Sequence, residues 1–131
     1  MKTILCIDDD GWVLTTLRDA LGLRGYRVVT TKNVAEAPTL LKFEKVDLVL
    51  LDLNMPGKTG FELYRDLRAV EAVPILFVSA CSRSFNMQSP LFMDLYQHEF
   101  LEGHTDILYK PFTLADLYEK VESLIGHCAT A

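Results

Sequence analysis

The side chains best suited to chemistry follow short apolar runs of the sequence. Asp8 and Asp9 follow the first run, Asp52 follows a later one, and Ser79 and Lys110 follow two more. Carboxylates that meet at one point repel each other, so one of them is driven toward protonation unless a cation intervenes. The sequence therefore predicts a cation site if the folded chain brings these acids together.

The other two residues, Ser79 and Lys110, could bind an anion next to that cation. Oxygen ligands favour a hard ion such as Mg²⁺, which binds through a few carboxylates and phosphate. Lys110 supplies a fixed positive charge and Ser79 a hydroxyl donor. A carboxylate can accept a phosphoryl group, and metal and lysine then stabilise the charge on the transferring group. The set indicates phosphoryl transfer onto one aspartate.

Each of these residues alone has an ordinary structural explanation. A single aspartate at the end of a strand is more often a helix cap or a turn residue, and we keep that interpretation for Asp10. A single lysine such as Lys110 is usually solvated. The joint placement of acids, hydroxyl and lysine at four strand ends is much harder to assign to chance.

The elements that must position these residues alternate along the chain. Apolar runs predict strands at 2–7, 27–31, 46–51, 73–78 and 106–109. Amphipathic or capped stretches predict helices at 12–24, from Asn33 onward, at 61–69, at 90–102 and after Thr113. The run at 46–51 is apolar without alternation, which indicates burial on both faces. The pattern is that of an α/β protein, a (βα)₅ doubly wound parallel five-stranded sheet, with ligands at the carboxyl ends of the strands.

The second predicted helix carries a local conflict. Asn33, followed three residues later by Glu36, resembles a capping box and opens this helix. Pro38 then falls within its first turns, where a proline should kink or shift the helix.

The last helix has clear ends. Thr113 with Asp116 predicts a capped start, and Gly126 predicts the end. We therefore expect one domain over 1–126 and a C-terminal tail over 127–131. Because no output domain follows, we expect that the chain acts alone or was cut from a longer protein.

Composition narrows the function classes. The 131 residues include 13 Lys and Arg against 18 Asp and Glu, a net charge of −5, which disfavours nucleic acid as a partner. The sequence has three cysteines, an odd number without a C-x-x-C pair: Cys6, Cys81 and Cys128. This pattern indicates reduced thiols rather than a disulfide framework or a zinc site. No signal peptide is visible, and the longest apolar run, 72–81, is too short to cross a bilayer. We expect a cytoplasmic protein without a membrane partner.

These residues together resemble the receiver domains of two-component response regulators, the CheY-like superfamily. The matching pieces run over nearly the whole chain in the family's order: Ile-Asp-Asp-Asp at 7–10, Asp-Leu-Val-Leu-Leu-Asp-Leu-Asn-Met-Pro-Gly at 47–57 with Gly60, Val-Ser-Ala at 78–80, and Lys-Pro-Phe at 110–112. The resemblance implies the flavodoxin-like strand order 2-1-3-4-5.

The resemblance also implies a metal site. Asp8 and Asp9 resemble the acidic pair that holds Mg²⁺ together with Asp52, and Asn54 resembles the residue whose backbone carbonyl completes the site.

The same resemblance implies the phosphoryl chemistry. Asp52 resembles the phosphoacceptor and Ser79 the switch hydroxyl that moves to bond the phosphoryl group. Lys110 resembles the lysine that pairs with a phosphoryl oxygen, and its bond to Pro111 is expected to be cis.

The function implied is a switch rather than an enzyme, with at most intrinsic autophosphatase activity. The phosphoryl donor would be a sensor histidine kinase or a histidine phosphotransfer protein. A downstream protein target would bind the face made by the fourth helix, fifth strand and fifth helix, and a homodimer is possible.

Two departures from the family pattern leave an alternative open. Three residues before the lysine the family usually has Tyr or Phe, and here that position is Ile107, with Tyr109 nearby. The segment 80–106 is long, and its stripe of Phe92, Tyr96 and Phe100 either packs on the sheet or enlarges an apolar surface for a partner or second copy. The alternative is a receiver-like interaction module whose output does not depend on phosphorylation.

Two rival motifs fail on their own residues. Gly57-Lys58-Thr59 is similar to the end of a phosphate-binding loop, but the first glycine of that motif would fall on Asp52. His98-Glu99 would begin a zinc-protease helix only if position 102 were His, and it is Glu102.

Overall fold

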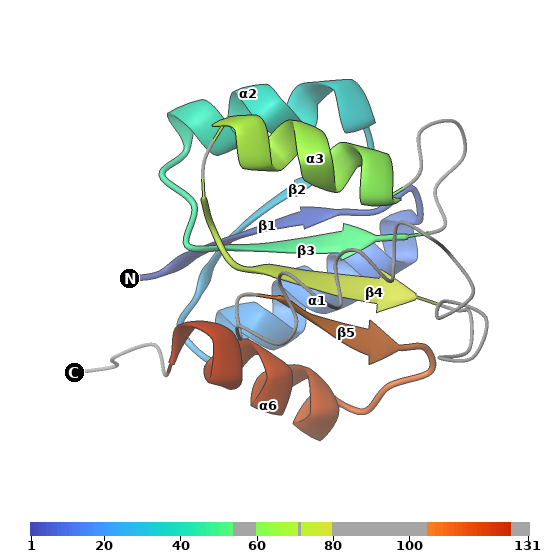
Figure 1. Ribbon diagram of the computed structural model, residues 1–131. Helices are drawn as coiled ribbons and strands as arrows, with labels where there is room; N and C mark the ends of the chain where they lie inside the picture. The colour runs from blue at the N-terminus through green and yellow to red at the C-terminus, as the bar shows by residue number, and fades with distance from the viewer. Residues whose placement is uncertain (54–59, 71, 80–104, 127–131) are drawn as a thin grey trace.

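The computed structural model describes residues 1–53, 60–70, 72–79 and 105–126 (Figure 1). Its centre is one sheet of five parallel strands in the order β2-β1-β3-β4-β5. The strands are β1 (Thr3–Ile7), β2 (Arg27–Thr31), β3 (Leu48–Asp52), β4 (Ile75–Ser79) and β5 (Thr105–Tyr109). The predicted strand order is confirmed.

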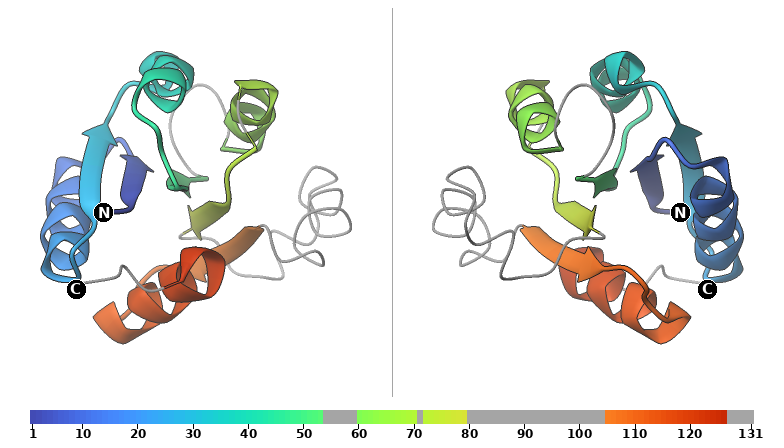
Figure 2. Two further views of the ribbon diagram at one scale, coloured as in Figure 1. Left: turned by 90° about the vertical axis from the view of Figure 1, so that its left-hand side faces the viewer. Right: turned by 90° about the vertical axis from the view of Figure 1, so that its right-hand side faces the viewer.

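Helices cover both faces of this sheet, as the views in Figures 1 and 2 show. One face carries α2 (Ala37–Phe43) and α3 (Gly60–Val70), and the other carries α1 (Gly11–Leu23) and α6 (Leu114–Ile125). The doubly wound α/β architecture is therefore confirmed. The helix predicted at 90–102 lies outside the described residues, and no described helix is long and apolar enough to cross a bilayer.

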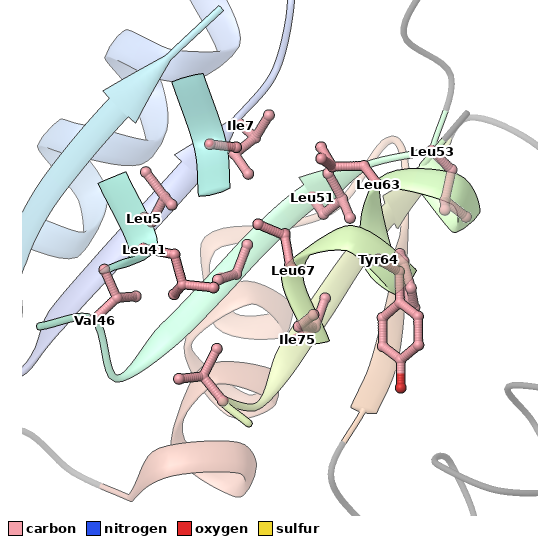
Figure 3. Close-up of a cluster of buried hydrophobic side chains, with 14 residues drawn as sticks. Leu5, Ile7, Leu41, Val46, Leu51, Leu53, Leu63, Tyr64, Leu67 and Ile75 are labelled. Atoms are coloured by element: carbon pink, nitrogen blue, oxygen red, sulfur yellow. The ribbon is translucent and has the colours of Figure 1, made fainter. Parts of the chain in front are cut away.

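Two hydrophobic clusters hold the layers together. Leu5 and Ile7 of β1 point into the cluster under α2 and α3, which Figure 3 shows in close-up. Ile4 and Cys6 alternate into the cluster under α1 and α6. Every residue of β1, β3 and β4 is buried, as the unbroken apolar run in β3 indicated. The sheet is thus a rigid platform for whatever its strand ends carry.

Two strands begin and end later than predicted. We expected strands at 46–51 and 73–78, but β3 covers Leu48–Asp52 and β4 covers Ile75–Ser79. Lys45, with a positive φ of 47°, precedes β3, and the pairing of β3 with β1 begins at Leu48. Because both strands end later than predicted, Asp52 and Ser79 are the last residues of their strands and not the first residues after them.

The start of the second helix differs in detail from its prediction. Asn33 caps the short turn that precedes this helix rather than the helix itself, since its side chain accepts a hydrogen bond from the backbone N–H of Ala35. The Glu36 carboxylate, however, accepts from the Thr31 hydroxyl at 3.1 Å, so no capping box forms. A short 3₁₀ turn, η1 (Val34–Glu36), comes first, and Pro38 then falls in the first turn of α2. A proline is tolerated there, which resolves the conflict seen in the sequence.

The last helix is capped and anchored as its sequence indicated. Thr113 and Asp116 form the predicted capping box, and Gly126 ends α6 with a positive φ of 76°. The hydroxyl of Tyr118 donates to the backbone carbonyl of Ala20 at 2.7 Å, which ties α6 to α1. Residues 127–131, the predicted tail, lie outside the described part of the chain.

Candidate functional site

The acidic residues singled out in the sequence meet at one edge of the sheet. Parallel pairing of Ile7 with Leu51 sets the ends of β1 and β3 level, so Asp8 and Asp52 come to lie side by side. Asp8, Asp9 and Asp52 each offer one carboxylate oxygen, and these three atoms lie within 4.8 Å of one another. The predicted convergence of the acids is confirmed.

The three carboxylates differ in exposure. Asp8 and Asp52 are almost fully buried, with 2% and 4% of their surface exposed, whereas Asp9 is exposed. The Asp8 carboxylate accepts a hydrogen bond from the backbone N–H of Asp10 at 2.9 Å. The Asp10 side chain in turn accepts from the backbone N–H of Trp12, so it caps α1 as expected and does not join the cluster. The cluster thus has two buried acids and one facing solvent.

A lysine stands against this cluster. The Nζ atom of Lys110 lies 3.5 Å from Oδ2 of Asp8. The backbone holds it there, because the N–H of Lys110 donates to the carbonyl of Ser79 at 2.8 Å, and the Lys110–Pro111 bond is cis as expected. Lys110 therefore faces the acids rather than open solvent.

The electrostatics of the cluster suit a divalent cation. Burial raises the pKa of Asp8 to about 6, and the neighbouring Asp52 carboxylate acts in the same direction. The Asp10 N–H and the Lys110 ammonium oppose this rise without cancelling it. A hard cation would relieve both the desolvation and the repulsion, and an oxygen-only donor set fits Mg²⁺. Asn54, the fourth predicted ligand, lies outside the described residues.

Ser79 reaches this edge on the other face of the sheet. It is fully buried at the end of β4, and strand alternation puts it on the face of Ile75 and Phe77, under α2 and α3. Asp52, two residues after Leu50 on β3, lies on the same face as Leu50, the face covered by α1 and α6. The structure therefore brings together Asp8, Asp9, Asp52 and Lys110, with Ser79 at an adjacent strand end.

The structure also answers which face of β5 Tyr109 takes. Ile107 packs against the cluster under α2 and α3, and Leu108 lies in the opposite cluster. Tyr109 therefore shares the face of Ile107, and its register partner in β4 is Ser79. Its hydroxyl oxygen is buried and has no hydrogen-bond partner. Sequence reasoning left this residue unassigned, because alternation fixes a face only once one residue of the strand has been placed.

Comparisons with known proteins agree on one family. The family model described as the response regulator receiver domain matches residues 4–122. The nisin biosynthesis regulatory protein NisR of Lactococcus lactis is 34% identical over 122 residues, which cover 93% of this chain and 49% of that protein. The chain spans about half the length of the curated relatives it matches.

Solved structures give the same result. The BeF₃-activated N-terminal receiver domain of Klebsiella pneumoniae RstA is 29% identical, with a TM-score of 0.79 and coverage of 95% of this chain and 98% of that one. The receiver domain of the sensor histidine kinase PA1611 of Pseudomonas aeruginosa is 26% identical, with a TM-score of 0.77 and the same coverage. That structure has a magnesium ion coordinated in its active-site cleft.

Proposed function

Since the chain belongs to the response regulator receiver domain family, we propose that it accepts a phosphoryl group on Asp52 and thereby switches partner binding. The donor would be a phosphohistidine of a sensor histidine kinase or a histidine phosphotransfer protein. The observation that carries the proposal is the convergence of Asp8, Asp9 and Asp52 within 4.8 Å, with Lys110 against Asp8.

Asp52 is the acceptor in this proposal. One of its carboxylate oxygens bonds to phosphorus while the bond from phosphorus to the donor imidazole breaks, and the imidazole, already protonated on its other nitrogen, leaves as a neutral ring. Its burial keeps competing water from the reacting atoms. The Lys110 ammonium binds an oxygen of the transferred group. Its ion pair with Asp8 is weakened as a result.

Asp8, Asp9 and Asp52, together with the backbone carbonyl of Asn54, would hold Mg²⁺. When bound, the ion supplies positive charge to the oxygens of the transferring group. The magnesium in the PA1611 receiver domain supports this choice of metal, as does the raised pKa of Asp8, because a carboxylate that resists ionisation gains most from a cation.

Switching requires Ser79 to change its environment. Ser79 ends β4 next to the end of β3, and its hydroxyl would turn toward Asp52 to bond a phosphoryl group. A phosphoryl group that binds Ser79 and Lys110 better in one arrangement shifts the population toward that arrangement. The readout surface we propose is β5 with its flanking helices. We further propose that 1–126 is the receiver domain, 127–131 its tail, and the cytoplasm its location.

A mass measurement tests the acceptor directly. Incubation with Mg²⁺ and acetyl phosphate should add the mass of one phosphoryl group, and Asp52→Asn should abolish the gain. Asp19→Asn is the matched control, because Asp19 is an exposed aspartate of α1 away from the cluster and should leave the gain intact. A gain that persists in Asp52→Asn would place the phosphoryl group elsewhere. No gain with acetyl phosphate or phosphoramidate would favour the alternative, a receiver-like module whose output is independent of phosphorylation.

A further inference from the structure

A second lysine lies at the carboxyl edge of the sheet, on the strand that flanks β1 on the side away from Lys110. Lys32 follows Thr31, the last residue of β2, whose carbonyl accepts a hydrogen bond from the N–H of Asp8 at 3.2 Å. Because Thr31 pairs in register with Ile7, Lys32 stands level with Asp8 on the neighbouring strand. The acidic residues that end β1 and β3 therefore have a lysine on each side.

The side chain of Lys32 extends to the start of α1. A Cβ atom on Gly11, the first residue of α1, would lie 2.9 Å from Nζ and 3.2 Å from Cε of Lys32. The ammonium group thus occupies space that a larger side chain at this position would need. Gly11 follows Asp8 and Asp9 by three and two residues. The charge of Lys32 is therefore held beside the loop that carries these two acids.

No direct ion pair neutralises this charge within the described residues. The lysines that form ion pairs there are Lys110, with Asp8, and Lys120, with Asp106. The N-terminus of a helix favours anions, so α1 itself offers no attraction for the Lys32 ammonium group. The charge is thus free to act across space on whatever binds at this edge of the sheet.

The sign of that action differs between the two ligands of the site. Lys32 and Asp52 are separated by two strand spacings, about 10 Å, because neighbouring strands lie about 4.8 Å apart. At that distance in water a unit charge changes the binding of a monovalent ion about twofold and of a divalent ion about fourfold. A cation held by the acids is repelled by Lys32, whereas an anion arriving at Asp52 is attracted.

Building on the proposed function, we propose that Lys32 is a specificity-determining residue that weakens Mg²⁺ binding and strengthens binding of the anionic phosphoryl donor. Lys110 is the lysine that contacts the acidic cluster directly, at 3.5 Å from Asp8. Lys32 acts from the opposite side without contact, so its effect is electrostatic and is screened by salt. The balance between metal and phosphoryl donor at this site thus depends on a residue of β2's end as well as on the residues that touch the ligands.

Neutralising Lys32 should move two affinities in opposite directions. Dissociation constants for Mg²⁺ and, with saturating Mg²⁺, for beryllofluoride, a phosphoryl mimic, are measured by calorimetry at an ionic strength of about 0.03 M, where screening over 10 Å is incomplete. Lys32→Gln should bind Mg²⁺ about two- to fourfold more tightly and beryllofluoride about twofold more weakly. At about 0.5 M salt both differences from the wild type should disappear.

Two further variants serve as controls. Lys32→Arg keeps the charge and should match the wild type for both ligands. Lys42→Gln removes a lysine from the last turn of α2, where the helix has run back from this edge, and should leave both dissociation constants unchanged.

The outcomes separate this inference from the proposed function. If the wild type binds neither Mg²⁺ nor beryllofluoride, the proposed function fails and the inference falls with it. If the wild type binds both and Lys32→Gln binds them equally well, the inference alone is overturned. Weaker binding of both ligands by Lys32→Gln would also overturn it, because a local structural defect weakens both whereas a charge acts on them with opposite signs. Differences that persist at about 0.5 M salt would likewise contradict an electrostatic role.

Discussion

Lys110 and Asp8 are 102 positions apart in the chain, yet the Nζ of Lys110 lies 3.5 Å from Oδ2 of Asp8. The contact links the end of β5 to the end of β1, although β3 and β4 lie between these strands in the sheet. The long lysine side chain therefore spans the edge at which Asp52 also ends its strand. An anion placed on Asp52 would compete with Asp8 for this ammonium group, and that competition underlies the first prediction.

Replacing the lysine should separate phosphorylation from its structural consequence. We expect Lys110→Ala to gain a phosphoryl group from acetyl phosphate and Mg²⁺, because Asp52 and the acidic cluster remain. The amide chemical shifts of β5 should then no longer change on phosphorylation, since the ammonium that binds the phosphoryl oxygen is gone. Lys120→Ala is the control, because Lys120 instead pairs with Asp106 at 3.0 Å. Unaltered β5 shift changes in Lys110→Ala would contradict this role.

The acidic cluster should cost stability when no metal is bound. The native pKa of Asp8 is about 6, above its ordinary value of 3.8, so the native state binds more protons than the unfolded state between these values. Stability from this group is therefore full below about pH 4 and is lost as the pH rises toward 6. In EDTA at pH 7, Asp8→Asn should raise the free energy of unfolding by about 1–3 kcal/mol.

Urea denaturation at pH 4 and pH 7 measures that effect. The gain from Asp8→Asn should shrink at pH 4, where the wild-type carboxyl is already mostly protonated in the native state. Asp47→Ala should destabilise instead, because the Asp47 carboxylate accepts a hydrogen bond from the backbone N–H of Thr3 at 2.8 Å and alanine offers no acceptor. A lower stability of Asp8→Asn than of the wild type at pH 7 would refute the electrostatic account.

The meeting of the acids at one edge of the sheet was predictable, although the ends of β3 and β4 lie one residue later than expected. Unbroken apolar runs gave buried parallel strands, and parallel strands must gather their carboxyl ends at one edge, so the meeting of Asp8 with Asp52 followed from chain order and register. The starts of α1 and α6 were equally predictable from their capping residues, Asp10 and Thr113. Each of these side chains bonds a backbone N–H within the next three residues, so the contact is local in the sequence.

Other features depended on contacts that local patterns do not encode. Glu36 has the spacing of a capping box, but a competing hydroxyl on Thr31, brought near by the turn after β2, takes its carboxylate. The faces of Ser79 and Tyr109 depend on where each strand starts to pair, and a shift of one residue reverses them. The unsatisfied hydroxyl of Tyr109 is a property of the packed interior, which no spacing along the chain reveals.

The cap of the last helix should contribute to stability without affecting the site. The Thr113 hydroxyl accepts from the N–H of Asp116 at 3.0 Å, and the Asp116 carboxylate accepts from the N–H of Thr113 at 3.3 Å. Thr113→Ala should lower the free energy of unfolding by about 1 kcal/mol, measured in urea. Ser123→Ala is the control, because the Ser123 hydroxyl donates to the carbonyl of Lys120 within the same helix and caps nothing. Equal stability of the Thr113→Ala variant and the wild type would contradict the capping role.

Metal binding should depend steeply on pH. Protons compete with Mg²⁺ for Asp8, so affinity should be highest above its pKa of about 6 and fall toward tenfold weaker per pH unit below it. Trp12 is the only tryptophan of the sequence, is 83% exposed and lies in the first turn of α1, three residues after Asp9, so its fluorescence is the probe for titrations between pH 5 and 8. Asp19→Asn, on the exposed face of α1, should follow the wild-type curve. A Mg²⁺ affinity that stays constant from pH 5 to 8 would exclude Asp8 as a ligand whose protonation opposes the metal.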